Sequence, residues 1–282
     1  MKLLVDGNIV SNDSWTLSPL DRAVLYGESA FELLRVYSGR PFELGLHLDC
    51  LGRACAQLSI PWPGAEVLRA EVATAIDGGA GDLALRVQLT RGNPALEISP
   101  RRVVSASAAV VPARHAYERG VAVVIDAALL VRPEAYFAAL KWGGYGAHMK
   151  ALERARAGGA EEALAVDSAG AVVEGATSNL FALIGAELVT AAEASGVRAG
   201  ITRAVVLDRA VARGVTVRQS AISLRELMSA REVFVTSSIR ELLPVARIDG
   251  VAVGDGRFEL TRALHRDLRV RACAAGPMPW EM

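Results

Sequence analysis

The sequence predicts two mixed α/β domains with a ligand cleft between them, and three observations support this prediction. The chain has 282 residues, 52% of them hydrophobic, which is enough to bury a substantial core in one large domain or two smaller ones. A polar segment that contains Pro and Gly, Pro112–Gly120, interrupts the chain. On both sides of this segment, β-branched runs of strand length alternate with stretches of helical periodicity. A cleft between two such domains is a usual place for a ligand.

Turn signals and hydrophobic spacing place the elements of the first half. Asp6-Gly7 between two short apolar runs predicts a hairpin. Leu48, Leu51, Cys55 and Leu58 follow one another at intervals of three and four, which predicts a helix. The expected elements are strands at 3–5, 9–10 and 30–37, helices at 44–58 and 65–76, and strands at 83–89 and 103–111.

Strands and helices continue to alternate after the polar segment. A turn at Ala169-Gly170 separates strands at 163–167 and 179–183, and Gly214 is placed to end a helix at 201–213. The other expected elements are strands at 121–131, 215–219 and 233–236, helices at 145–157, 224–229 and 258–274, and a hairpin at 245–253. We set the domain boundaries at 1–114 and 121–282, with a linker at 115–120.

Composition argues against several classes of protein. The 31 basic and 31 acidic residues balance, so no large field attracts nucleic acid or an anionic membrane. No segment approaches the ~20 apolar residues of a membrane span, and the N-terminus lacks the apolar core of a signal peptide. Three cysteines without a CxxC pair suit a reducing cytoplasm, and the four widely spaced histidines match no metal-ligand pattern. We expect a cytoplasmic protein without a metal site.

Lysine is rare in this chain, which narrows the search for covalent chemistry. The only lysines are Lys2, Lys141 and Lys150. Lys141 follows the apolar run Tyr136–Leu140 and precedes Trp142-Gly143-Gly144. Partial burial there favours the neutral amine that a Schiff base requires, and the glycines let a flat ring approach the backbone. The alternative is a surface lysine that follows a strand.

A carboxylate and two polar segments are candidates for holding a cofactor. Glu174 ends an apolar strand, where it could hold a proton on a pyridine nitrogen; the alternative is an ordinary glutamate in a turn. The helix start at Arg198–Thr202 and the strand end at Thr236–Ser238 could each bind an anion through N–H groups and hydroxyls. A helix cap and a polar turn are the simpler explanations.

Two arginines in apolar strands of the first domain are candidates for binding a substrate carboxylate. Arg35 and Arg86 have the planar fork that suits this task. An internal ion pair is the alternative for both, and Glu32 is a candidate partner for Arg35.

Taken together and in this order, these residues resemble the class IV aminotransferases. That family includes branched-chain aminotransferases, D-amino-acid aminotransferases and aminodeoxychorismate lyases. The resemblance covers nearly the whole chain and includes Asp21-Arg22, Tyr26-Gly27, Phe31-Glu32, Arg35, His47-Leu48, Lys141, Glu174-Gly175, Ser178–Phe181, Gly200–Arg203 and Thr236–Ser238. It implies a D-amino-acid-aminotransferase-like fold, with a small α+β N-terminal domain and a larger C-terminal α/β pseudo-barrel. It also implies a homodimer and pyridoxal 5'-phosphate as the cofactor.

The resemblance also implies roles for single residues. Lys141 would form the Schiff base and move a proton, and Glu174 would bind the pyridine nitrogen. Ile201 and Thr202 would bind the phosphate through backbone N–H groups, and Ser238 through its hydroxyl and amide. The other implied residues are Ser178, Asn179 and Ser237 for the cofactor, and Tyr26, Phe31, Arg35 and Arg86 for the substrate.

Two positions depart from the family pattern. Cys50 stands where members commonly have an arginine that contacts the phosphate. Loss of such a charge-assisted contact weakens binding by ~1.5–3 kcal/mol, and Arg53, one helical turn later, is a candidate substitute. Gly146 stands where some branched-chain members have a tyrosine, with Tyr145 beside it.

Three functions remain open at this point. The pattern of Tyr26, Phe31, Arg35 and Arg86 favours transamination of a branched-chain-like L-amino acid with a 2-oxo acid. The Thr236–Val245 stretch equally resembles aminodeoxychorismate lyases, which eliminate pyruvate to give 4-aminobenzoate. Cys50 is the motive for the third hypothesis, a degenerate member without catalysis. The lyase threonine expected after Glu32 is absent, and so are the arginine and histidine of D-specific enzymes after Thr90-Arg91-Gly92.

Overall fold

A computed structural model gives the fold and describes residues 1–11, 15–135, 137–273 and 278–281. The chain divides into two compact units, one made of Met1–Val110 with Leu140–Tyr145 and the other of Val111–Ala139 with Gly146–Met282. The expected linker, 115–120, lies in the second unit, mostly within helix α4 (Arg114–Arg119). The short segment with Lys141 belongs to the first unit although it follows the linker in sequence.

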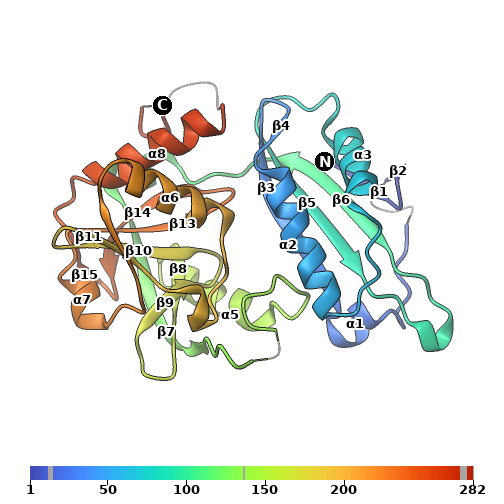
Figure 1. Cartoon of the computed structure of the whole chain (residues 1–282), viewed down its shortest axis with the longest axis horizontal. Coiled ribbons are helices and arrows are strands. Elements are labelled where there is room, and N and C mark those ends of the chain that lie inside the picture. The colour runs from blue at the N-terminus through green and yellow to red at the C-terminus, as the bar shows by residue number, and fades with distance from the viewer. Residues whose placement is uncertain (12–14, 136, 274–277, 282) are drawn as a thin grey trace. The chain divides into compact units, whose positions relative to one another are not determined.

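The first unit is an antiparallel sheet of six strands with two longer helices on one face. The strands are β1 (Lys2–Val5), β2 (Asn8–Val10), β3 (Ser29–Tyr37), β4 (Arg40–Pro41), β5 (Leu83–Thr90) and β6 (Arg102–Ala108), in the order β2-β1-β6-β5-β3-β4. The helices are α1 (Arg22–Tyr26), α2 (Leu44–Gln57) and α3 (Ala65–Ile76). Figure 1 shows α2 running along the sheet formed by β3 and β5.

The alternation of buried and half-buried residues along β5 indicates which face of the sheet the helices cover. Residues 83, 85, 87 and 89 are buried, while those between them are half-buried. Glu32 lies opposite residue 87 and contacts His47 of α2, and Arg102 lies opposite residue 89 and contacts Glu71 of α3. Both helices therefore pack on the same, buried face of the sheet.

The second unit is a β-barrel with helices around it. Its strands are β7 (Val121–Leu130), β8 (Glu162–Val166), β9 (Val172–Gly175), β10 (Asn179–Ile184), β11 (Glu187–Thr190), β12 (Thr216–Gln219), β13 (Glu232–Ser237), β14 (Glu241–Ile248) and β15 (Val251–Ala252). The pairing of β9 with β10 closes the ring β10-β13-β14-β7-β8-β9, in which only β14–β7 and β7–β8 are parallel. The longer helices are α5 (Gly146–Ala157), α6 (Ile201–Ala212) and α8 (Glu259–Arg271), and α7 (Leu224–Met228) is short.

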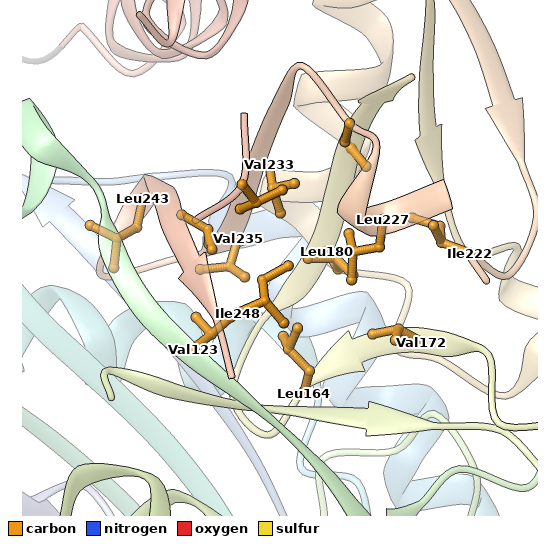
Figure 2. Packing of buried hydrophobic residues seen from close by; sticks show 14 of the residues in the cluster. Val123, Leu164, Val172, Leu180, Ile222, Leu227, Val233, Val235, Leu243 and Ile248 are labelled. Atoms are coloured by element: carbon orange, nitrogen blue, oxygen red, sulfur yellow. The ribbon is translucent and has the colours of Figure 1, made fainter. Parts of the chain in front are cut away.

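Side chains from every strand of the ring fill its interior. Figure 2 shows the labelled side chains pointing toward a common centre, with Leu227 of α7 and Ile222 of the loop before it among them. The labelled members are Val123, Leu164, Val172, Leu180, Ile222, Leu227, Val233, Val235, Leu243 and Ile248. The barrel is thus a packed core, and its polar chemistry lies at the strand ends.

The predicted fold class, a mixed α/β chain with a C-terminal barrel, is confirmed. Several details differ from the expected elements. The turn at Ala169-Gly170 joins β8 to β9, so β9 rather than β10 follows it. The elements β4, β11, α1 and α4 were not expected. Helix α8 ends at Arg271, and the last residue of the predicted helix 258–274 lies outside the described residues. Within the described part of the chain, no helix is long and apolar enough to span a membrane.

Candidate active site

The lysine segment, Leu140–Tyr145, is held by backbone hydrogen bonds to β3. The Phe31 amide donates to the Lys141 carbonyl at 3.0 Å, and the Gly143 amide donates to the Ser29 carbonyl at 2.8 Å. A Cβ on Gly143 would lie 2.3 Å from the Gly27 carbonyl oxygen, so only glycine allows this close approach. The segment therefore extends the sheet beside β3 and fixes the position of Lys141.

The side chain of Lys141 ends at a buried carboxylate. Its Nζ donates to Glu32 Oε2 at 2.8 Å, and His47 Nδ1 lies 2.7 Å from the same oxygen. Burial opposes ionisation of Glu32, but the Lys141 ammonium and the His47 hydrogen bond outweigh it and lower the pKa of the carboxyl. The Lys141 side chain is only 27% exposed, so it is not a freely solvated surface lysine.

Arg53, the candidate substitute for the phosphate-binding arginine of the family pattern, lies next to Cys50, which stands in that arginine's place. Arg53 Nη2 is 3.1 Å from Cys50 Sγ, one turn earlier on α2. Burial raises the pKa of the Cys50 thiol, which therefore stays neutral at pH 7. The guanidinium thus reaches back to the turn where the family usually has its arginine.

Arg35 does not pair with Glu32, the candidate partner from the sequence. Its Nε and Nη2 donate to Asp82 Oδ2 at 3.1 and 2.8 Å, and its guanidinium lies 4.9 Å from the centre of the Tyr37 ring. Glu32 instead binds His47 and Lys141. Arg35 therefore forms an internal ion pair, which was the alternative to binding a substrate carboxylate.

Arg86 has a different environment, although it lies on the same face of the sheet as Arg35. Its guanidinium lies 3.9 Å from the centre of the Phe31 ring, which also meets the Tyr145 ring edge-on at 5.3 Å. Its Nε donates to Gln88 at 3.1 Å, and no carboxylate of the described residues pairs with it. Tyr26, by contrast, is exposed on α1.

In the second unit, three polar side chains form a row across adjacent strands. Glu174 of β9 lies opposite Asn179 of β10, which lies opposite Thr236 of β13. Directly opposed residues point to the same face of a sheet. The hydroxyl of Thr236 is buried and has no hydrogen-bond partner among the described residues.

Glu174 is buried and held by the segment that precedes α6. Its Oε2 accepts from the backbone amide of Arg198 at 3.1 Å, and the Arg198 guanidinium lies 3.4 Å from its Oε1. Asn179 donates to the Arg198 carbonyl at 2.8 Å. Burial raises the pKa of the Glu174 carboxyl, against the opposing effect of Arg198.

Gly200 allows the backbone at the start of α6 to lie close to Asn179. Gly200 is the N-cap, and a Cβ there would lie 2.0 Å from Asn179 Oδ1, so a side chain does not fit. The first turn, with Ile201 and Thr202, leaves backbone N–H groups without intrahelical acceptors. These groups carry the positive end of the helix dipole, which attracts an anion.

The remaining predicted serines adjoin a buried network that the sequence did not reveal. Ser178 Oγ donates to Glu162 at 2.9 Å, and Glu162 also pairs with Arg240. Ser237 Oγ accepts from the Arg240 amide at 3.3 Å. Glu162 and Arg240 are 78 positions apart and carry no local motif, so no signal linked them. Ser238 follows Ser237 in the turn that leads to β14.

These features occur in the order expected for one family. The family model described as amino-transferase class IV matches residues 29–248. The chain belongs to the class IV aminotransferases. This family uses pyridoxal phosphate, so both the predicted family and the predicted cofactor are confirmed.

Relatives within the class IV aminotransferases have several activities. A D-alanine aminotransferase of Listeria innocua is 30% identical over 97% of this chain and 98% of its own length. The branched-chain amino acid aminotransferase of Escherichia coli superposes with a TM-score of 0.87 at 26% identity, covering 94% of this chain and 92% of its own. The 4-amino-4-deoxychorismate lyase of Pseudomonas aeruginosa superposes with a TM-score of 0.80 at 32% identity, covering 95% and 98%.

Proposed function

We propose that this chain is an aminotransferase that moves an amino group between a branched-chain-like L-amino acid and a 2-oxo acid. The observation that carries the proposal is the environment of Arg86, a half-buried guanidinium stacked on Phe31 with no carboxylate partner among the described residues. Every substrate of this reaction has a carboxylate, and a guanidinium fork binds it well. The adjoining rings of Phe31 and Tyr145 offer apolar surface for a side chain.

The second unit supports the proposal through its fit to the cofactor. A buried carboxylate, Glu174, suits a protonated pyridine nitrogen, because the positive nitrogen would stabilise the negative charge that burial disfavours. The glycine-led start of α6 suits a phosphate, as does the buried, unpartnered hydroxyl of Thr236 beside Ser237 and Ser238. We propose Asn179 as the residue that orients Glu174, and Ser178 as support for the turn after β9.

Lys141 is the proposed catalytic residue. When bound, pyridoxal phosphate supplies an aldehyde that condenses with amines and a ring that withdraws electrons from the substrate carbon. Lys141 Nζ provides the amine for attachment and, once free, takes and returns the proton of the substrate carbon. The backbone pairing with β3 fixes the main chain from which this side chain extends.

The lyase is the second candidate, and the similarity to the Pseudomonas aeruginosa enzyme at 32% identity favours it. Leu33-Leu34 occupy the places where the lyase threonine is expected, which favours the transaminase instead. The D-alanine aminotransferase relative raises the question of stereochemistry. Asn93 bonds to the Leu20 carbonyl, and Pro94–Leu96 offers neither arginine nor histidine, which favours an L-amino acid.

A homodimer is part of the proposal. Helix α1 exposes Val24, Leu25 and Tyr26, and Leu20 precedes them. Exposed apolar side chains that adjoin one another suit a contact with a second copy. Light scattering on the eluting protein checks this, since a monomeric mass at micromolar concentration would contradict it.

The first experiment records the visible spectrum of the protein with pyridoxal phosphate, before and after borohydride, beside Lys141→Ala. A yellow band that borohydride removes and the variant lacks supports Lys141 as the attachment point. Wild-type protein that stays colourless favours the degenerate member. Donor and acceptor screening then separates the reactions, because transamination needs a 2-oxo acid and gives ping-pong kinetics. Release of pyruvate and 4-aminobenzoate without a 2-oxo acid identifies the lyase.

A further inference from the structure

Glu32 is shared by two cationic or proton-donating groups from different parts of the first unit. Lys141 Nζ lies 2.8 Å and His47 Nδ1 2.7 Å from the same oxygen, Oε2. Glu32 and His47 are 6% and 2% exposed, so water competes little for these contacts. A buried carboxylate of this kind fixes both partners more firmly than a surface ion pair does.

The proton on His47 follows from its surroundings. Burial lowers the pKa of His47, although Glu32 acts in the opposite direction, so the ring is neutral at pH 7. An ionised carboxylate only accepts, which places the ring proton on Nδ1. His47 Nε2 is buried without a partner among the described residues, so Glu32 alone orients the ring through hydrogen bonding.

We propose that Glu32, oriented by His47, is a positioning residue that holds the amine of Lys141 as an ammonium in the cofactor-free protein, before the lysine attaches to the cofactor. This inference rests on the proposed role of Lys141. The ammonium is the form that delivers a proton, and the neutral amine is the form that attaches, so Glu32 sets the balance between the two.

Other charged groups near this cluster come from α2. Asp49, Cys50 and Arg53 lie close enough to interact electrostatically with one another or with Glu32, and Glu43 at the helix start interacts with His47. On β5, the residue opposite Glu32 is Val87, which carries no charge. The contact of 2.8 Å with Glu32 makes that carboxylate the dominant partner of the lysine.

Trinitrophenylation of the lysines in the cofactor-free protein tests the proposal. Trinitrobenzenesulfonate reacts only with neutral amines, and peptide mass spectrometry reports each lysine separately. Lys2 and Lys150 serve as internal references, because Lys2 donates to the Asp77 carbonyl and Lys150 pairs with the exposed Glu153. Glu32→Gln removes the charge that pairs with the ammonium, so it should label Lys141 about tenfold faster at pH 7.5, with the references unchanged.

Variants of His47 separate orientation from simple packing. In His47→Asn the amide takes the place of Nδ1–H, so Lys141 should keep its wild-type labelling profile. His47→Leu removes the donor and should move the profile in the same direction as Glu32→Gln. Thermal unfolding and circular dichroism identify any variant that fails to fold, and Glu32→Asp, with the charge retained, then replaces Glu32→Gln and should label like the wild type.

An unchanged Lys141 profile in folded Glu32→Gln would overturn the proposal. So would a slow-labelling His47→Leu together with a fast-labelling His47→Asn. The labelling uses no cofactor, so it is independent of the proposed function. If the wild-type protein binds no pyridoxal phosphate, the proposed cofactor role of Lys141 is wrong. If Glu32→Gln still labels Lys141 faster in that case, the proposed role of Glu32 holds.

Discussion

Glu174 and Asn179 lie opposite each other in the pairing of β9 with β10, and both bond to the backbone of Arg198. The carboxylate accepts from the Arg198 amide and the Asn179 amide donates to the Arg198 carbonyl. One residue before α6 therefore joins the buried carboxylate to the anion-attracting helix start. A single ligand with a basic ring nitrogen and a phosphate would satisfy both ends of this arrangement.

Removal of the Glu174 charge should stabilise the cofactor-free protein at neutral pH. Burial raises the pKa of Glu174, so the folded state binds its proton more tightly than the unfolded state. Its contribution to stability therefore falls as the pH rises from about 4.5 through the folded pKa. Glu174→Gln should unfold at higher urea than wild type at pH 8, with the difference shrinking toward pH 4.5. A less stable variant at pH 8 would contradict this prediction. Glu134→Gln, at an exposed position, is the control.

Arg53 should contribute to cofactor affinity in place of the arginine missing at Cys50. A hydrogen bond to a charged group contributes ~1.5–3 kcal/mol, so Arg53→Gln should weaken pyridoxal phosphate binding by about tenfold or more. Cys50→Arg should strengthen it. Fluorescence titration of the cofactor-free protein measures both, with the exposed Arg69→Gln on α3 as control. Equal affinity in Arg53→Gln and wild type shows that Arg53 does not substitute.

Arg86 should matter for catalysis and not for stability. It has no carboxylate partner among the described residues, so its removal breaks no ion pair there. Arg86→Met should lower kcat/KM for the 2-oxo acid by about tenfold or more, the effect of losing one charge-assisted contact. Arg86→Lys keeps the charge without the planar fork, so its kcat/KM should lie between those of Arg86→Met and the wild type. A loss of stability with kcat/KM unchanged would assign Arg86 a structural role instead.

Arg35 should behave in the opposite way. Its ion pair with Asp82 and its stacking on Tyr37 are internal contacts of a residue that is only 7% exposed. Arg35→Met should lower the free energy of unfolding by about 1–3 kcal/mol, with KM unchanged at temperatures where the variant is folded. Asp82→Asn, which breaks the same pair from the other side, should show a smaller effect in the same direction. A raised KM without loss of stability would identify Arg35 as a substrate clamp.

His148 should make the protein acid-sensitive. Burial, followed by the nearby Arg198, lowers the pKa of this histidine from 6.5 to about 4. Between these values the unfolded state takes up a proton that the folded state does not, so stability falls as the pH drops from 6.5 to 4. His148→Asn should flatten this part of the urea-midpoint profile, whereas the exposed His115→Asn should not. An unchanged slope in His148→Asn would show that the imidazole is protonated in the folded state.

Local patterns in the sequence were sufficient for most elements. Asp6-Gly7 predicted the first hairpin and the spacing of Leu48 and Leu51 predicted α2, because turn residues and helical periodicity act over a few positions. Helix α1 was not expected because it has five residues and none of them is buried. Its ends depend on the Asp21 side chain, which accepts from the Ala23 amide at 2.8 Å, and on Gly27 at φ 73°.

The partners of charged residues could not be predicted in the same way. Glu32 was the nearest candidate for Arg35 in sequence, but three positions separate the two in β3, so their side chains point to opposite faces of the sheet. Asp82 meets Arg35 because β3 and β5 pair in a register that brings residue 84 opposite Arg35. Register is a property of the whole sheet. The pair formed by Glu162 and Arg240 depends in the same way on closure of the barrel.

The pairing of Lys141 and Gly143 with β3 also protects the protein against aggregation. The two residues of β4 cover only the far end of β3, at Val36 and Tyr37. The lysine segment occupies the hydrogen-bonding groups at the near end, which would otherwise be free to pair with the strand of another molecule. The side chain at 141 can therefore change through evolution without exposing this edge, whereas shortening the segment would remove the reactive amine and its protection together.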